Sequence, residues 1–281
     1  MNTIFQLSQY ALQELKDSYS IYEIRSLCHI ICMDTFGFTN IDIHLRKNEI
    51  LDESFIKKFC DIIHHLKAGI PIQYILGETE FAGLRISVNA STLIPRPETQ
   101  ELVHWIAPTL SPGERLIDIG TGSGCIAIAL ARQCPGLWVT AIDLSEEALA
   151  VARQNATNNG VEATFLQRDI LHYENYSWPV FDIVVSNPPY VRESEKADME
   201  SRVLDYEPHS ALFVPDDDPL IFYRRIAAFG RQYLKPGGLL YFEINEALGS
   251  EMRDMLVKYG YQDIEIKQDI FGKERMIRSI R

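Results

Sequence analysis

The sequence predicts a small helical bundle followed by an α/β domain with a mostly parallel sheet. Two observations predict this architecture. Apolar residues recur at helical spacing through the first 75 residues. From residue 114 onward, short apolar runs alternate with helical patterns, and repeated units of this kind form a parallel sheet covered by helices on both faces. We therefore expect a helical domain over 1–75, a β-hairpin linker over 76–92 and an α/β domain over 93–281.

The individual elements follow from the same two periods. Apolar spacing predicts helices over 3–18, 20–34, 39–46 and 52–67. Alternation around a glycine predicts a hairpin over 80–88. Strands are expected at 116–119, 138–142, 164–167, 183–186, 239–244, 264–267 and 275–279, and helices at 125–133, 146–158, 219–234 and 250–259.

Composition narrows the class of protein. The hydrophobic share of 46% and the charged share of 23% are those of a globular protein. The sequence lacks an apolar run of the roughly 18 residues that a membrane span needs, and it lacks a secretory signal. The five scattered cysteines lack metal-binding spacing, which favours reduced thiols in the cytoplasm and predicts no metal. A net charge of −12 argues against direct nucleic-acid binding and favours a basic protein partner. We expect a monomer.

The first strand of the α/β domain ends in a glycine-rich turn that begins at Asp118. Glycines permit a tight turn and let a ligand approach the backbone closely. The turn lacks the Lys-Ser/Thr of a phosphate-binding loop. Its candidate cofactor-binding residues are Gly120, Thr121, Gly122, Ser123 and Gly124.

Two acidic residues follow the next two strands. Asp143 lies 23 residues after Gly120, the distance at which a carboxylate can bind ribose hydroxyls. The alternative for Asp143 is a helix N-cap, although Ser145 can take that role. Asp169 follows the third strand and either accepts from an adenine amino group or is a solvated turn residue.

The fourth strand ends at Asn187-Pro188-Pro189-Tyr190. The prolines cannot continue a central strand, so the chain leaves the sheet at Asn187. The Asn187 amide and the neighbouring carbonyls are then presented at the carboxyl end of the strand, where open α/β sheets bind ligands. This arrangement can accept both N–H groups of a planar NH2 while the ring of Tyr190 covers its flat face. We therefore interpret Asn187, Pro188 and Tyr190 as catalytic.

The glycine turn, Asp143 and Asn187–Tyr190 resemble class I methyltransferases that use S-adenosylmethionine and act on a planar nitrogen. Three further segments make the chain similar to the HemK/PrmC family of release factor N5-glutamine methyltransferases. They are 71–77 with Glu80 and Phe81, 93–99 (Leu-Ile-Pro-Arg-Pro-Glu-Thr) and 269–275 (Asp-Ile-Phe-Gly-Lys-Glu-Arg). The resemblance covers essentially the whole chain.

The resemblance implies methyl transfer from S-adenosylmethionine to the glutamine of the Gly-Gly-Gln motif of peptide chain release factors, leaving S-adenosylhomocysteine. It implies that the helical domain recognises the protein substrate. Asn187 is expected to contact both cofactor and substrate. Arg96 and Glu98 are assigned to substrate binding, although Arg96 is equally suited to a structural ion pair. The residues implied in gripping the substrate amide are Asn187, Pro188, Pro189 and Tyr190.

The chain departs from the family pattern in places. Ile170 stands where many members have an aromatic residue against adenine, which replaces stacking by aliphatic contact, and Gln100 replaces a common glutamate. The alternative functions are a glutamine methyltransferase of a ribosomal protein, an adenine-N6 nucleic acid methyltransferase and a non-catalytic module that keeps the fold. The acidic charge disfavours the second, and the intact motifs disfavour the third.

Overall fold

The computed structural model describes the backbone of residues 1–281 and every side chain except that of Asp198. Within these described residues the chain forms two compact units. Unit 1 comprises Met1–Gly77 and Glu200–Tyr206, and unit 2 comprises Glu78–Met199 and Glu207–Arg281. None of the helices in the described part combines the length and the apolar character that a membrane crossing requires.

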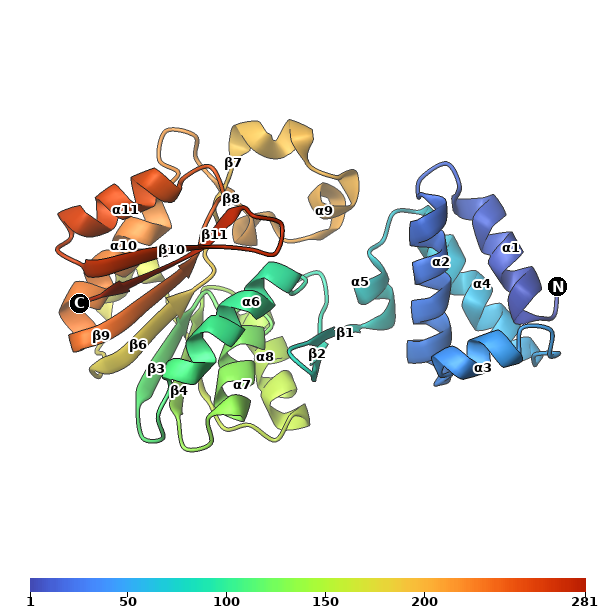
Figure 1. The fold of residues 1–281 in the computed structure, drawn as a ribbon, viewed down its shortest axis with the longest axis horizontal. Coiled ribbons are helices and arrows are strands. Elements are labelled where there is room, and N and C mark those ends of the chain that lie inside the picture. Colours follow the sequence, from blue (N-terminus) through green and yellow to red (C-terminus); the bar gives the residue numbers. More distant parts are fainter. The chain divides into compact units, whose positions relative to one another are not determined.

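Unit 1 is helical, and short-range capping defines where its helices begin. Ser20 and Glu23 form a capping box at the start of the second helix, and Asp52 caps the fourth through the Phe55 N–H. The apolar faces of the helices form one hydrophobic core, which includes Leu7 on the first helix and Ile63 on the fourth. The helices are α1 (Ile4–Leu15), α2 (Ile21–Ile30), the π-helical turn η1 (Ile31–Thr35), α3 (Asn40–Leu45), α4 (Glu53–Lys67) and α5 (Ile72–Leu76) (Figure 1).

A short helix from much later in the sequence completes unit 1. This helix, α9 (Ser201–Tyr206), falls within the 93–281 range expected for the α/β domain. The Tyr206 hydroxyl donates to the Ala68 carbonyl at 2.8 Å. The Arg202 guanidinium lies over the Tyr19 ring, 4.4 Å from its centroid.

Unit 2 contains a seven-stranded sheet within the described chain, in the order β10-β11-β9-β6-β3-β4-β5. Strands β9, β6, β3, β4 and β5 pair in parallel, whereas β11 is antiparallel to both neighbours. The predicted mostly parallel sheet is therefore confirmed. The strands are β3 (Arg115–Ile119), β4 (Trp138–Asp143), β5 (Thr164–Gln167), β6 (Phe181–Ser186), β9 (Leu234–Glu243), β10 (Gln262–Gln268) and β11 (Glu274–Ile280).

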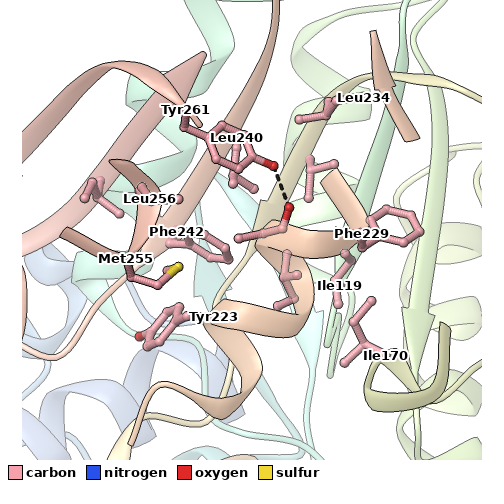
Figure 2. Close-up of a cluster of buried hydrophobic side chains, with 14 of the residues drawn as sticks. Ile119, Ile170, Tyr223, Phe229, Leu234, Leu240, Phe242, Met255, Leu256 and Tyr261 are labelled. Atoms are coloured by element: carbon pink, nitrogen blue, oxygen red, sulfur yellow. Dashed lines mark hydrogen bonds between the residues drawn. The ribbon is translucent and has the colours of Figure 1, made fainter. Parts of the chain in front are cut away.

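Helices cover both faces of this sheet, and alternating side chains of β9 show how. The Tyr241 ring meets Trp105 on one face with centroids 5.5 Å apart, and Phe242 meets Tyr223 on the other at 5.1 Å. The first face carries α6 (Pro97–Ile106), α7 (Cys125–Gln133) and α8 (Glu146–Asn158), and the second carries α10 (Ile221–Tyr233), α11 (Gly249–Lys258) and the 3-10 segment η3 (Ile170–Asn175). Figure 2 shows the core of the second face, where the Tyr261 hydroxyl donates to the Ala227 carbonyl at 2.9 Å.

Short elements complete unit 2. A two-stranded hairpin, β1 (Glu78–Phe81) and β2 (Leu84–Ser87), forms within the segment expected to be a hairpin linker. The long segment after β6 folds into small pieces that the sequence did not predict. These pieces are β7 (Val191–Arg192), η4 (Glu193–Asp198), η5 (His209–Ala211) and β8 (Phe213–Val214), and η2 (Ala107–Thr109) follows α6.

Candidate functional site

A cavity of about 270 Å³ opens at the carboxyl ends of β3 and β6. These strands are parallel neighbours, with Ile119 opposite Ser186. The chain passes from β3 to β4 and β5 on one side and later returns to β6 on the other side. The loops after β3 and β6 therefore diverge, which is where open α/β sheets bind ligands.

The structure brings most of the predicted site residues to this cavity. The predicted residues that line it are Gly120, Thr121, Gly122, Ser123, Asp143, Asp169, Ile170, Asn187, Pro188 and Pro189. The predicted residues that are not among the lining residues are Gly124, Tyr190, Arg96 and Glu98.

The turn requires glycine at its three glycine positions for different structural reasons. All have positive φ: +74° at Gly120, +55° at Gly122 and +81° at Gly124. A Cβ at Gly120 or Gly122 would meet no protein atom within 4 Å, so these two leave open space at the cavity. A Cβ at Gly124 would lie 3.0 Å from both the Ala152 Cβ and the Ile128 Cδ1. Gly124 therefore permits close packing between helices and does not line the cavity.

Asp143 ends β4 with its carboxylate oriented by two backbone groups. It accepts from the Gly122 N–H at 2.8 Å and from the Ser145 N–H at 2.9 Å. The N-cap of α8 is Ser145, whose hydroxyl accepts from the Ala148 N–H. Burial raises the pKa of Asp143, and these backbone hydrogen bonds oppose the rise. A carboxylate has about four acceptor positions, so two remain for hydroxyls of a ligand.

Asp118 stabilises the same turn through a hydrogen bond. It is fully buried, and it accepts the Thr121 hydroxyl at 2.6 Å. Burial raises the pKa of Asp118 to about 7. Its carboxylate thus links the end of β3 to the glycine turn.

Asp169 and Ile170 form another part of the cavity wall. The Asp169 carboxylate accepts from the Leu171 N–H at 2.8 Å and lies 2.7 Å from the His172 Nδ1, so it caps η3. The Ile170 side chain is 8% exposed and joins the hydrophobic core of the second face (Figure 2). Together with Leu144 and Leu171 it makes this part of the cavity apolar.

The Asn187 amide is held on one side only. Its Nδ2 donates to the Thr99 hydroxyl at 3.2 Å, and Thr99 donates in turn to Glu243 at 2.6 Å. The Tyr190 hydroxyl donates to the other Glu243 oxygen at 3.0 Å. Burial and the Glu243 charge hold the pKa of Tyr190 well above its usual range, so its phenol remains a donor. The Asn245 amide donates to the Tyr190 carbonyl at 3.2 Å.

Arg96 lies in an ion pair. Its guanidinium contacts Glu207, whose side chain is 1% exposed and which also accepts from the Ile94 N–H at 3.1 Å. The geometry matches the structural alternative considered for Arg96. Glu98 lies beside it in the first turn of α6.

Sequence reasoning missed Glu243, Glu207 and Asn245. A signal existed for the first, because Glu243 is an acidic residue that directly follows the apolar run 239–242 in its strand. Among the described side chains, three or more His, Cys, Asp or Glu residues do not assemble into an arrangement that could hold a metal.

Known proteins resemble this chain over nearly its full length. Residues 6–77 match the model of the PrmC N-terminal domain, and residues 98–206 match the methyltransferase small domain. A release factor glutamine methyltransferase of Bacteroides thetaiotaomicron is 47% identical over 98% of this chain and 99% of its own. A release factor glutamine methyltransferase of Flavobacterium psychrophilum is 45% identical over 95% of each chain. This chain belongs to the release factor glutamine methyltransferase family.

Solved structures support the fold. A methyltransferase from Pyrococcus furiosus matches 70% of this chain and 89% of its own with a TM-score of 0.53 and 20% identity. Membership of the release factor glutamine methyltransferase family makes the chain a methyltransferase enzyme. It also accounts for the joint presence of the Asn187 loop and the helical unit 1, because both family models match this one chain.

Proposed function

We propose that this enzyme transfers a methyl group from S-adenosylmethionine to the side-chain nitrogen of the glutamine in the Gly-Gly-Gln motif of peptide chain release factors. The observation that carries the proposal is the Asn187 amide at the cavity. Its Nδ2 is committed to Thr99, and among the described groups its Oδ1 has no hydrogen-bond partner. That oxygen can accept an N–H of a planar amide.

Two parts of the cavity lining match the proposed cofactor, the glycine turn with Asp143 and the apolar wall near Ile170. The open space beside Gly120 and Gly122 admits a close-lying ligand, and Asp143 retains acceptor positions for two ribose hydroxyls. Ile170 and Leu171 offer an apolar surface for adenine. Asp169 would accept from the adenine amino group with the acceptor positions that Leu171 and His172 leave open.

The cofactor, held by the glycine turn and Asp143, would supply an electrophilic methyl group. The methyl would pass from the sulfonium, which would leave as a neutral thioether, to the amide nitrogen, which would then lose a proton to solvent. The chain's own contribution is orientation. Asn187 Oδ1 and the Pro188 carbonyl would accept the two N–H bonds of the substrate amide. Tyr190, which is not among the residues that line the cavity, would support the loop through its hydrogen bond to Glu243. Holding reactants in this way contributes at most roughly 7–11 kcal/mol to lowering a barrier.

The partner would be a release factor protein, recognised in part by unit 1, and the enzyme would act as a cytoplasmic monomer without a metal. The net charge of −12 supports a basic protein surface as the partner in preference to nucleic acid.

The first experiment uses methyl-labelled S-adenosylmethionine with a bacterial release factor and with the same factor carrying Ala in place of the Gly-Gly-Gln glutamine. Label in the first factor and none in the second is the expected result. Label in neither, with cofactor binding intact, would contradict the proposed substrate, and a ribosomal protein would be tested next.

Asn187→Ala tests the site itself. The variant is expected to lose turnover while keeping its fold, because the substrate N–H loses its acceptor, at a cost of about 1–3 kcal/mol for each unpaired group besides the loss of orientation. Asn158→Ala is the matched control, since Asn158 is an exposed amide on α8. Single-turnover methylation measures the effect, and normal activity of Asn187→Ala would refute the assignment.

A further inference from the structure

Thr99, Asn187 and Glu243 are distant in sequence but are linked by hydrogen bonds through Thr99. Strand β6 pairs with β9 so that Ser186 lies opposite Phe242, which places Asn187 next to Glu243. Thr99 reaches the same point from the first turn of α6 and is 3% exposed. Glu243 is 1% exposed. The proposed reaction assigns no step to Thr99 or Glu243.

The hydrogen bonds among these residues have a fixed direction. The Thr99 hydroxyl donates its single hydrogen to one Glu243 oxygen at 2.6 Å, and the Tyr190 hydroxyl donates to the other at 3.0 Å, so both oxygens of Glu243 act as acceptors. The Thr99 oxygen is then left as an acceptor, and it receives the Asn187 Nδ2 at 3.2 Å. Turning the Asn187 amide over would place Oδ1 against the Thr99 lone pairs, with no hydrogen between them.

The second oxygen of Glu243 acts on the other end of the loop. It accepts the Tyr190 hydroxyl at 3.0 Å, while the Tyr223 hydroxyl donates to the Glu243 backbone carbonyl at 3.0 Å. One buried carboxylate thus holds both the amide and the aromatic ring of Asn187–Tyr190. Burial raises the pKa of Glu243, and the hydrogen bonds from Thr99 and Tyr190 and the charge of Arg275 oppose the rise.

We propose that Glu243 and Thr99 are positioning residues that set which way the Asn187 amide points, so that its oxygen and not its NH2 meets the substrate nitrogen. The inference rests on the proposed function for the identity of the substrate. A reversed Asn187 amide would present donors to the donors of the substrate NH2. The fraction of enzyme in that orientation would be inactive even with cofactor and substrate bound.

The 93–99 segment contributes to this arrangement through Thr99. Near its start the Ile94 N–H donates to Glu207, and the segment ends with Thr99. Pro97 starts α6 with a favourable backbone conformation. The segment thereby delivers one hydroxyl to a fixed place between a carboxylate and an amide.

The test compares two replacements at Thr99. Thr99→Val keeps the shape and removes the hydroxyl, whereas Thr99→Ser keeps the hydroxyl. We expect Thr99→Val to lower kcat by about 10–100-fold, as for a displaced reacting group, with KM for the cofactor changed less than about threefold. Thr99→Ser is expected to stay within about threefold of the parent. Glu243→Gln should also lower kcat, because Thr99 and Tyr190 donate to different carboxylate oxygens and the substitution turns one of these two acceptors into an NH2 donor.

Side-chain amide NMR supplies a readout that does not depend on the substrate. The Asn187 NH2 signals of the 15N-labelled full chain are identified by their loss in Asn187→Ala. They are expected to shift in Thr99→Val and to return in Thr99→Ser. Unchanged signals in Thr99→Val would overturn the inference, and so would equal slowing of turnover by Val and Ser.

The two proposals fail in different ways. If the unsubstituted enzyme labels no release factor, the proposed substrate is wrong, and the NMR comparison still decides whether Thr99 orients Asn187. If the enzyme labels the factor and Thr99→Val is fully active, only the positioning role is refuted. Thermal unfolding of each variant separates slow turnover from loss of fold.

Discussion

Replacing Gly124 with alanine tests whether the third glycine of the turn serves packing and the first serves the cavity. Gly124 has a φ of +81°, and an added Cβ would lie 3.0 Å from Ala152 Cβ and from Ile128 Cδ1. Both neighbouring side chains are packed between helices α7 and α8, so neither can move freely. Gly120 is the matched control, because its φ is +74° and an added Cβ meets nothing within 4 Å.

The two variants differ by one contribution to the free energy of unfolding. An alanine in the left-handed region costs about 1–2 kcal/mol, and both variants bear this cost. Overpacking adds about 1–3 kcal/mol at Gly124 alone. We therefore expect losses of about 1–2 kcal/mol for Gly120→Ala and about 2–5 kcal/mol for Gly124→Ala. At about 2–4 °C for each kcal/mol, the falls in Tm are about 2–8 °C and about 4–20 °C.

Tryptophan fluorescence during urea unfolding can report on the relevant unit. Trp105, Trp138 and Trp178 all lie in unit 2, so the signal follows the domain that contains the turn. Binding of S-adenosylmethionine by calorimetry should give the opposite ranking, because the Cβ of Gly120→Ala takes up space at the cavity. Equal stability of the two variants, or tighter cofactor binding by Gly120→Ala, would refute the reasoning.

Two further predictions concern buried carboxylates. Burial raises the pKa of Asp118 from 3.8 to about 7. The stability that follows from protonation of Asp118 is complete below pH 4 and is lost as the pH rises through 7. Asp118→Asn should therefore reduce the fall in unfolding free energy between pH 4 and pH 8 by about 4 kcal/mol. An unchanged pH dependence in urea titrations would contradict this. Arg96→Ala should destabilise unit 2 by about 3–5 kcal/mol because Glu207 stays buried without its charge partner. Adding Glu207→Gln should recover part of that loss in the same titration, and a normal stability of Arg96→Ala alone would show that the pair is not structural.

The regular elements were predictable because each is encoded locally. Buried parallel strands appear as short apolar runs, and β3, β4 and β6 lie where such runs end in Asp118, Asp143 and Asn187. The site residues at these strand ends were predictable for the same reason. A parallel sheet places the carboxyl ends of its strands along one edge, so residues that follow different strands converge.

The segment between β6 and α10 was not predictable, because distant contacts stabilise it. Strands β7 and β8 are two residues each and, in the described part of the chain, form a sheet of their own. The Ser194 hydroxyl donates to Asp216, 22 residues later, at 2.6 Å. Helix α9 contacts Ala68 through Tyr206, a separation of 138 residues. Periodicity over a short window carries no information about any of these contacts.

Arg96 and Thr99 show the same limit at the site. Their residue types are visible in the sequence, but Arg96 pairs with Glu207 at a separation of 111 residues and Thr99 donates to Glu243 at a separation of 144. The Thr99 hydroxyl can donate or accept a hydrogen bond, so its role toward Asn187 depends on whether a carboxylate lies beside it. The register of β6 on β9 makes that choice, because it places Glu243 and not an apolar residue beside the end of β6. A one-residue slip would turn the alternate face of β9 toward Thr99, so the direction of the Asn187 amide depends on sheet register as well as on the local motif.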